Sequence, residues 1–246
     1  MMYSIRSVLH MAVITVWVVT ATIVLGTAAI FVAFFSKKGD IAHLVARAWG
    51  KSILWVSAVA VDVQGREHLR RTASCILMPN HQSNFDIPVL LGCLPVQFRW
   101  LAKKELFNIP LFGRSMRGCG YISIDRSDRR AAFKSLATAA QRIRQGVSVL
   151  IFPEGTRSRD GRILPFKKGG FVLAVDAGVP VVPIVIHGTR RIMPKGRFLV
   201  QSGPVVMKIL PPIDTRAYTR KTKENLMQAV HAAISGALDK MEPECR

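Results

Sequence analysis

The chain has 246 residues and a formal net charge of +20, from 35 Lys and Arg against 15 Asp and Glu. This length suffices for one sizeable α/β domain with an additional segment, and the charge predicts an anionic partner: a phospholipid surface, a nucleic acid, or an acidic carrier or cofactor. Aromatic residues make up only 8% of the chain and do not alternate with basic ones as in proteins that stack bases, which argues against nucleic acid.

The N-terminal part contains 25 consecutive uncharged positions, residues 11–35. At about 1.5 Å per residue, a helix of this length can cross a hydrocarbon core of about 30 Å. The stretch 34–38 at the end of this segment does not resemble the small-residue cleavage site of a signal peptide. A second apolar stretch, 52–61, is too short to span but can pair with the first as a hairpin in one leaflet, so the sequence leaves both arrangements open.

Basic residues are distributed unequally around the apolar segment. Only Arg6 precedes it, whereas Lys37, Lys38, Arg47 and Lys51 follow it. The positive-inside rule therefore predicts a membrane-bound protein with its main domain on the cytoplasmic face, at the inner or cell membrane in a bacterium. We divide the chain into a membrane-anchoring helical segment, 1–60, and a main domain, 61–246.

Helical and strand-like patterns alternate after the apolar segment. Helices are predicted at 41–60, 87–94, 111–118, 129–145, 170–177 and 223–238. Strands are predicted at 61–63, 75–78, 98–102, 121–124, 147–152 and 181–186, with a pair of strands inside 198–210 broken near Gly203 and Pro204. This order predicts an α/β fold with a mostly parallel or mixed sheet wrapped by helices.

The segment 80–86 joins a predicted buried strand to a predicted helix and contains His81 and Asp86. In one continuous helix, residues five apart lie about 140° apart and do not meet, but a strand-to-helix turn can bring them together. A carboxylate on one imidazole nitrogen leaves the other nitrogen as a general base. The alternative is a helix-capping Asp beside a hydrogen-bonded loop His.

Two further clusters stand at strand ends. Residues 120–126 end a strand with Asp125 and Arg126, for which a surface salt bridge is the alternative. In the turn at 152–157, Gly155 allows backbone to approach a ligand, Thr156 offers a hydroxyl and Arg157 offers a planar fork suited to phosphate. A plain turn with solvated charges is the alternative there.

These clusters, together with the apolar run 181–186, resemble the four sequence blocks of the 1-acyl-sn-glycerol-3-phosphate acyltransferases in the same order. The first block is His81-x4-Asp86, and the others fall at 120–126, 154–157 and 182–184. Residues 102–106, 109–113 and 166–169 also look like family sequence, so the resemblance covers about 61–211. One departure is the stretch 121–124, where the family more often has an aromatic residue just before Ile-Asp-Arg.

The resemblance implies a glycerolipid acyltransferase-like fold and transfer of a fatty acyl group from acyl-CoA or acyl-carrier protein to the sn-2 hydroxyl of 1-acyl-glycerol-3-phosphate, giving phosphatidic acid. His81 is implied as the base and Asp86 as its orienting partner. Substrate-binding residues carried over from the blocks are Lys103, Arg126, Glu154, Gly155, Thr156 and Arg157. Arg157 is expected to bind the phosphate, followed by Lys103 and Arg126, and Glu154 to hold an Arg or accept a glycerol hydroxyl.

The implied chemistry needs no covalent intermediate. A neutral imidazole, with an ordinary pKa of about 6.5, suits activation of an alcohol, and a thiol with a pKa of about 8.5 leaves without a strong acid. Ser83 is the alternative nucleophile and is better interpreted as a turn or cap residue. Neither the cysteines nor the remaining histidines have metal-ligand spacing, so we expect no metal and no cofactor besides the co-substrate.

Two other functions remain open. The nearer one is an acyltransferase of the same fold that uses a lyso-ornithine lipid or another lysophospholipid, although Arg157 favours lysophosphatidate. The other is a non-catalytic, membrane-tethered binder of anionic lipid or nucleic acid, which leaves the four ordered blocks unexplained.

Overall fold

The computed structural model describes residues 5–36, 38–70, 74–125, 127–197 and 199–244. Within them, seven strands form one sheet in the order β1-β7-β6-β2-β5-β3-β4. All neighbouring strands are parallel except β6 and β7, which pair antiparallel. The strands are β1 (Val59–Gln64), β2 (Ile76–Pro79), β3 (Arg99–Lys103), β4 (Ile122–Ile124), β5 (Val149–Leu150), β6 (Val181–His187) and β7 (Gly203–Ile209).

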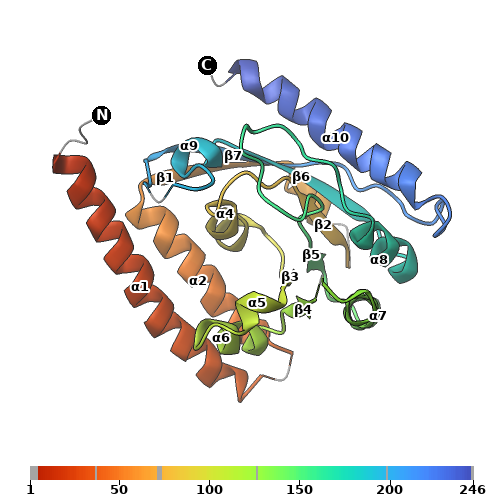
Figure 1. Cartoon of the computed structure of the whole chain (residues 1–246), viewed down its shortest axis with the longest axis horizontal. Helices are drawn as coiled ribbons and strands as arrows, with labels where there is room; N and C mark the ends of the chain where they lie inside the picture. Colours follow the sequence, from red (N-terminus) through yellow and green to blue (C-terminus); the bar gives the residue numbers. More distant parts are fainter. Residues whose placement is uncertain (1–4, 37, 71–73, 126, 198, 245–246) are drawn as a thin grey trace.

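Helices cover both faces of this sheet (Figure 1). They are α1 (Ile5–Ala33), α2 (Asp40–Val56), α3 (Glu67–Arg70), α4 (Asp86–Cys93), α5 (Lys104–Phe107), α6 (Phe112–Gly118), α7 (Arg129–Arg144), α8 (Gly169–Ala177), α9 (Thr189–Ile192) and α10 (Lys223–Glu244). Because side chains alternate along a strand, Leu77 of β2 enters the core shared with α2 and α4, whereas Ile76 and Met78 enter the core shared with α7, α8 and α10. The predicted helix-wrapped mixed sheet is confirmed.

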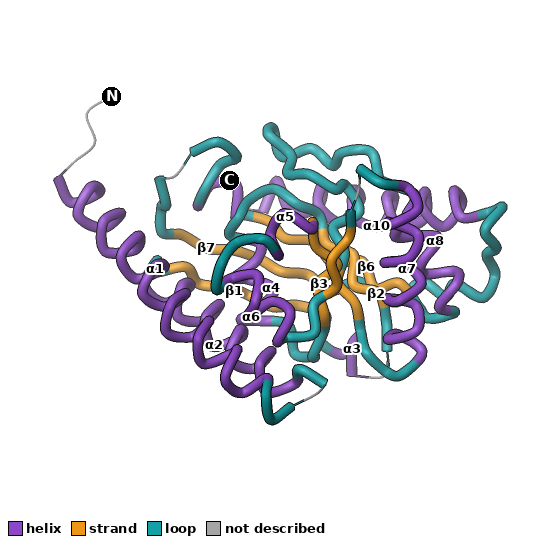
Figure 2. The backbone as a smooth tube through the Cα atoms, turned by 60° about the horizontal axis from the view of Figure 1, so that its bottom comes forward, coloured by secondary structure: helices purple, strands orange, loops and turns teal. Residues whose placement is uncertain are grey.

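The first two helices form an antiparallel hairpin, visible in two views (Figures 1 and 2). Trp17 Nε1 donates to Ser52 Oγ at 3.2 Å, and Trp49 Nε1 donates to Thr22 Oγ1 at 3.0 Å. The apolar helix therefore packs on α2, and the part of the stretch 52–61 that lies in this helix takes part in the packing, since Trp55 also lies edge-on to Trp17. That stretch is divided between the end of α2 and the strand β1.

α1 contains the one helix segment among the described residues that is long and apolar enough to cross a membrane, Val8–Ala33, with a mean hydropathy of 2.3. Only 11% of the most apolar stretch of this helix is buried inside the protein. Large apolar side chains such as Val16 (65% exposed) and Phe31 (63% exposed) point away from the rest of the chain. An exposed apolar surface of this extent indicates membrane association.

Two predicted elements are wrong in detail. The helix expected over 41–60 ends at Val56, because Ala58 adopts a positive φ of 50° and Val59 begins to pair with Gly203 of β7. The two strands expected within 198–210 are one strand, β7, which begins at Gly203 and continues through Pro204. Pro204 is tolerated because it lies at the start of the strand. Phe198 lies outside the described residues.

Candidate active site

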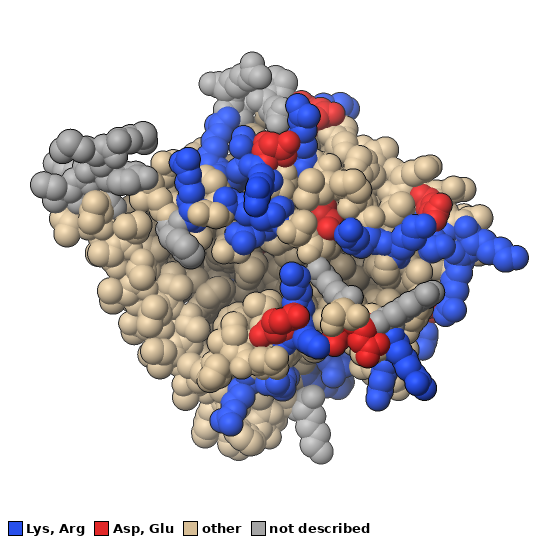
Figure 3. Space-filling view, in the orientation of Figure 1, with Lys and Arg blue, Asp and Glu red and all other residues tan. Residues whose placement is uncertain are grey.

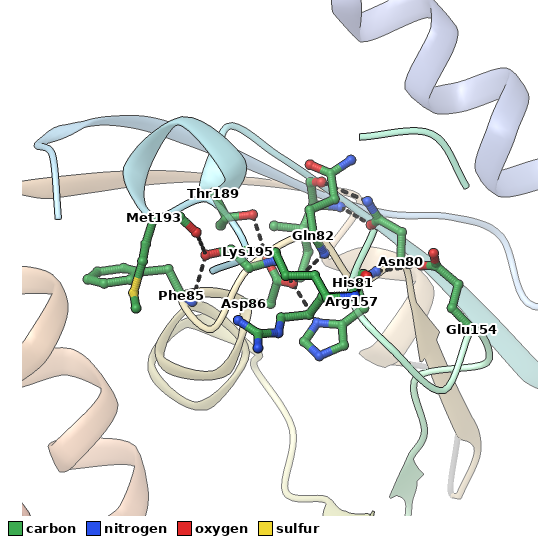
Figure 4. A network of polar contacts seen from close by, with 12 residues as sticks. Asn80, His81, Gln82, Phe85, Asp86, Glu154, Arg157, Thr189, Met193 and Lys195 are labelled. Atoms are coloured by element: carbon green, nitrogen blue, oxygen red, sulfur yellow. Dashed lines mark hydrogen bonds and ion pairs between the residues drawn. The ribbon is translucent and has the colours of Figure 1, made fainter. Parts of the chain in front are cut away.

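His81 and Asp86 meet in the turn between β2 and α4, at the carboxyl end of a central strand (Figure 4). His81 Nδ1 lies 2.8 Å from Asp86 Oδ2. Asp86 is the first residue of α4, so the helix start holds the carboxylate while the turn carries the imidazole back over it. The structure thus brings together the two residues that the sequence proposes as base and orienting carboxylate.

The Asp86 carboxylate is fully buried and its oxygens are occupied by donors. Oδ2 accepts the backbone amides of Gln82 at 2.8 Å and Ser83 at 2.9 Å in addition to the His81 ring, and Oδ1 accepts the Thr189 hydroxyl at 2.5 Å. Since a carboxylate surrounded by donors only accepts, the proton of the neutral imidazole belongs on Nδ1. Nε2 is then the nitrogen that can take a proton from a substrate.

The plane of the imidazole is fixed by aromatic stacking, which sequence reasoning missed. The Phe152 ring lies 3.8 Å from the His81 ring, centroid to centroid, at an interplanar angle of 14°. Trp100 of β3 also stacks on Phe152, with centroids 5.5 Å apart. Phe152 lies two residues beyond the buried strand β5 and just before the third block, and this position is the only signal that could have suggested its role.

Glu154 binds backbone and is 1% exposed. Its Oε1 accepts the His81 amide at 2.6 Å and its Oε2 accepts the Leu164 amide at 2.9 Å. Burial raises the pKa of Glu154 to about 7, although the two amide hydrogen bonds oppose that rise. With both oxygens occupied by the protein, this arrangement favours positioning of His81 over the substrate contact inferred from the resemblance.

The remainder of the third block surrounds His81. The amide of Ser158 donates to the His81 carbonyl at 2.8 Å, so the loop 154–158 is bound to the base at two points. Gly155 turns the chain at a φ of 72° and lines the same cavity as His81. A residue with a Cβ would be strained in that conformation, which explains the glycine.

Arg157 and Thr156 lie beside the dyad at the surface. Among the described residues, nothing is hydrogen-bonded to or paired with the Arg157 guanidinium, which Figure 4 places next to the His81 ring. Lys195 Nζ donates to the Arg157 carbonyl at 2.7 Å and to Thr156 Oγ1 at 3.3 Å. Sequence reasoning missed both Lys195 and Thr189, which lie in and just after the four-residue helix α9.

The cationic residues of the other blocks are placed differently. Lys103 ends β3, is exposed and lines the same cavity as His81. The Asp125 carboxylate pairs with Lys104 and accepts the Ser127 hydroxyl at 2.6 Å. The hydrogen bond from the Lys104 ammonium is the main reason that the pKa of Asp125 lies well below its usual range. Arg126 lies outside the described residues, so its proposed role stays a prediction.

Ser83 is part of the turn. It is fully buried, and its hydroxyl donates to the Met193 carbonyl at 2.7 Å and accepts the Phe85 amide at 3.0 Å. These contacts support the turn or cap interpretation and leave the hydroxyl oriented away from attack. Asn80 fixes the start of the same turn, because its side-chain amide exchanges two hydrogen bonds with the backbone of Ile186 at 3.0 and 2.7 Å.

An apolar cavity of about 220 Å³ begins at His81 and Gly155 and extends between β3, α4 and α6 to the N-terminal hairpin. Its inner wall includes Leu25, Gly26 and Ala29 of α1 and Trp49 of α2. Around the site, Lys and Arg side chains gather over the α9 region, whereas the side formed by α1 and α2 shows little charge (Figure 3). The exposed cations in and around α9 include Arg159, Arg162, Arg190 and Arg197.

A His–Asp pair with a buried carboxylate, at the mouth of an apolar cavity and with cations beside it, defines a site for acyl transfer on an amphiphilic substrate. A family model described as Acyltransferase matches residues 60–187. The chain belongs to the 1-acyl-sn-glycerol-3-phosphate acyltransferase family, as the four sequence blocks predict.

Three similar proteins support this assignment. The chain resembles the crystal structure of the 1-acyl-sn-glycerophosphate (LPA) acyltransferase PlsC from Thermotoga maritima, with a TM-score of 0.83, 30% identity and 98% of both chains covered. It is 31% identical to a 1-acyl-sn-glycerol-3-phosphate acyltransferase from Haemophilus influenzae over 90% of each chain. It is 37% identical to one from Limnanthes douglasii over 74% of this chain, which spans 64% of that plant protein's length.

Proposed function

We propose that the protein transfers a fatty acyl group from an acyl thioester to the sn-2 hydroxyl of 1-acyl-glycerol-3-phosphate, forming phosphatidic acid and a free thiol. The observation that carries this proposal is the His81–Asp86 pair at the opening of an apolar cavity. The similarity to proteins named for this activity supports the same reaction.

In the proposed reaction, His81 Nε2 removes the proton of the acceptor hydroxyl as its oxygen attacks the thioester carbonyl. The imidazolium that forms is stabilised by Asp86, whose negative charge is held in place by two amides and the Thr189 hydroxyl. Collapse of the tetrahedral adduct breaks the C–S bond and releases the thiolate. His81 then returns its proton to that thiolate or to solvent, so no acyl-enzyme is needed.

The acceptor's phosphate is assigned to the cations at the mouth. Arg157 offers a planar guanidinium without a partner in the described part of the chain, and Lys103 lines the cavity that His81 also lines. A guanidinium can bind two phosphate oxygens at once, which suits recognition of a phosphomonoester. The apolar cavity beyond His81 receives an acyl chain.

The helical hairpin is proposed as the membrane anchor, within the segment 1–60, and residues 61–246 as the acyltransferase domain. The basic residues that follow α1 favour the cytoplasmic face. α2 shares a core with α4, so the anchor is packed directly on the domain that carries the base. This packing supports a site held close to the lipid surface.

An acyl-transfer assay tests the proposal. Purified enzyme in detergent and in vesicles is given acyl-CoA or acyl-carrier protein with a panel of acceptors: lysophosphatidate, lysophosphatidylcholine, lysophosphatidylethanolamine and a lyso-ornithine lipid. Phosphatidic acid as the main product supports the proposal. Preference for an acceptor without a phosphomonoester favours the related acyltransferase function, and no transfer with any acceptor contradicts both. The two donors, compared at equal thioester concentration, identify the carrier.

A further inference from the structure

We propose that residues 189–195 are a positioning element of the active site, which holds the general base through Thr189 and the acceptor-phosphate loop through Lys195. This inference rests on the proposed function. The segment comprises α9 and the turn after it and lies outside the four sequence blocks. Three of its residues, Thr189, Met193 and Lys195, each contact a different part of the site (Figure 4).

Thr189 acts on the base through Asp86. Both residues are fully buried, and the hydroxyl lies 2.5 Å from Asp86 Oδ1, the carboxylate oxygen that His81 does not use. Because a buried carboxylate oxygen without a donor is destabilised, this hydroxyl determines how the carboxylate is oriented and how its charge is shared. Thr189 does not contact the reacting atoms, so its role is positional.

The backbone fixes where Thr189 stands. The preceding Gly188 has a φ of 100°, and a side chain there would come within 2.6 Å of the Pro204 carbonyl oxygen of β7. The glycine therefore allows α9 to begin directly against β7, at the carboxyl end of β6. In the same segment, the Met193 carbonyl accepts a hydrogen bond from the Ser83 hydroxyl at 2.7 Å. This hydrogen bond ties the segment to the turn that carries His81.

Lys195 acts on the acceptor side. Its ammonium binds the Arg157 carbonyl at 2.7 Å and the Thr156 hydroxyl at 3.3 Å, so it fixes the backbone from which the Arg157 guanidinium projects. An ammonium in this place also adds positive charge near the phosphate. The same short segment therefore sets the distance between the base and the phosphate-binding residue.

Thr189→Val tests the first contact, because valine keeps the shape and removes the donor. We expect kcat to fall about 10- to 100-fold, as for loss of a hydrogen bond to a charged group, with the KM for lysophosphatidate changed less than about threefold. Without the hydroxyl, Asp86 attracts the His81 proton more strongly, so the acidic limb of the kcat profile moves to higher pH. Thr189→Ser should restore both quantities.

Other charged groups facing His81 are Glu154, behind its backbone amide, and the cations Arg157, Lys195 and Lys103 at the mouth. These groups are unchanged in Thr189→Val, so a pH shift that serine reverses reports the lost hydroxyl. The matched control is Thr215→Val. Thr215 is 2% exposed, and its hydroxyl donates to the Val179 carbonyl at 3.0 Å, in a region away from the dyad. This control should leave kcat and the pH profile unchanged.

Lys195→Met tests the second contact. We expect the KM for lysophosphatidate to rise about 10-fold or more, with kcat and the donor's KM changed less than about threefold. The matched control is Lys223→Met, because Lys223 also donates to a backbone carbonyl, that of Arg220 at 2.9 Å, on the surface formed by α10.

Wild-type enzyme and His81→Ala are assayed in parallel. The positioning role alone would be overturned if the wild type transfers acyl groups and Thr189→Val keeps its kcat and pH profile. The same holds if the wild type is active and Lys195→Met keeps its KM for lysophosphatidate. Equal losses in Thr189→Val and Thr215→Val would also overturn it, since they indicate a general loss of stability. No transfer by the wild type to lysophosphatidate would contradict the proposed function instead.

Discussion

Glu154 Oε1 lies 2.6 Å from the amide nitrogen of His81, so the carboxylate of the third block holds the backbone of the residue that the first block contributes as base. The same carboxylate reaches the Leu164 amide at 2.9 Å. A buried carboxylate that accepts two amides can hold two loops together, but its charge is desolvated. The raised pKa of Glu154, about 7, reflects this conflict.

Glu154 should make stability depend on pH. Its pKa is raised from 4.5 to about 7, so between these values the folded protein keeps a proton that the unfolded chain has lost. Stability should therefore fall as pH rises from 4.5 to 7, by on the order of 3 kcal/mol, and stay low above 7. Glu154→Gln removes this pH dependence of stability, and one of the two backbone amides then loses its acceptor.

We also expect Glu154→Gln to lower kcat on the order of 10-fold, because His81 is held less firmly.

Melting temperatures in detergent from pH 5 to 8 measure the effect. The melting temperature of the wild type, minus that of Glu154→Gln, should decrease from pH 5 to about 7 and then level off. Glu224→Gln is the control, because this half-exposed carboxylate pairs with Lys168 at 2.6 Å on the surface. A difference that stays constant with pH would show that Glu154 does not titrate in this window.

Much of the fold could be predicted because hydrophobic periodicity reflects burial. The apolar run 181–186 gives β6, which is buried on both faces, and the helical spacing of apolar residues at 129–145 gives α7. The pairing of β7 with β1 could not be predicted, since it joins residues more than 140 positions apart and depends on where α2 ends. The positive φ of Ala58 that ends α2 has no signal in the sequence.

In the active site, too, some residues could be predicted from the sequence and others could not. His81 and Asp86 could be paired from the sequence because one turn connects them, and Ser83 could be assigned to that turn. Thr189, 103 residues beyond Asp86, reaches it only through the packing of α9 against the sheet, so no local pattern identifies it. Glu154 was expected near the acceptor, but its burial and its backbone partners depend on the fold of the loop up to Leu164.

His81→Ala should reduce acyl transfer by at least the 10²- to 10⁴-fold typical of removing a general base. Asp86→Asn should cost a comparable factor, because an amide cannot accept all the donors around Oδ2 and fixes the wrong tautomer of His81. Radiolabelled phosphatidic acid formed from lysophosphatidate measures both. Asp86 Oδ2 keeps two backbone amide donors when the imidazole is removed, so His81→Ala should keep a wild-type melting temperature to within a few degrees.

Two results would contradict this assignment. One is retention of more than about a tenth of the activity by His81→Ala. The other is a trapped acyl-enzyme that disappears in Ser83→Ala, since direct attack forms no such species. Ser83→Ala itself should lose stability, because the Met193 carbonyl and the Phe85 amide then lose a buried partner.

Arg157→Ala should raise the KM for lysophosphatidate about 10- to 100-fold, the loss expected for a charged hydrogen bond to phosphate of about 1.5–3 kcal/mol. The KM for the acyl donor should change much less. Arg157→Lys should recover only part of the loss, because lysine keeps the charge and lacks the fork. Arg216→Ala, which removes an exposed arginine paired with Asp214 at 2.7 Å, is the control. Equal effects on both substrates would indicate a structural or donor-side role for Arg157.

Gly26→Leu should shorten the acyl chains that the enzyme accepts. Gly26 lines the cavity, and a Cβ placed there would lie 3.6 Å from Leu111 Cγ, which is ordinary contact, so α1 can carry a side chain at this point. Each methylene that no longer fits loses about 0.8 kcal/mol of burial. Rates with a series of donors from short to long chains should therefore drop only at the long end. Gly236→Leu on α10, where no atom lies within 4 Å of a Cβ, should leave the series unchanged. A uniform decrease in Gly26→Leu would contradict the cavity assignment.

The exposed face of α1 should determine how the protein is held at the membrane. Val16 and Ile23 are 65% and 53% exposed on a helix of which only a small part packs on the protein. Full-length protein should therefore remain in the membrane pellet at high salt, because burial of apolar surface does not weaken with ionic strength.

Val16→Glu combined with Ile23→Glu should release a substantial fraction of the protein from the pellet. A charged side chain within the apolar layer costs about 2.5–3.5 kcal/mol, and there are two. The released fraction should increase with salt, since the remaining attachment is to anionic headgroups through the basic surface around α9. Ala232→Glu, on the exposed side of α10, is the control and should stay in the pellet. Release of the unaltered protein by salt alone would show that α1 is not embedded. Retention of the double variant in the pellet would show that this face of α1 does not contact lipid.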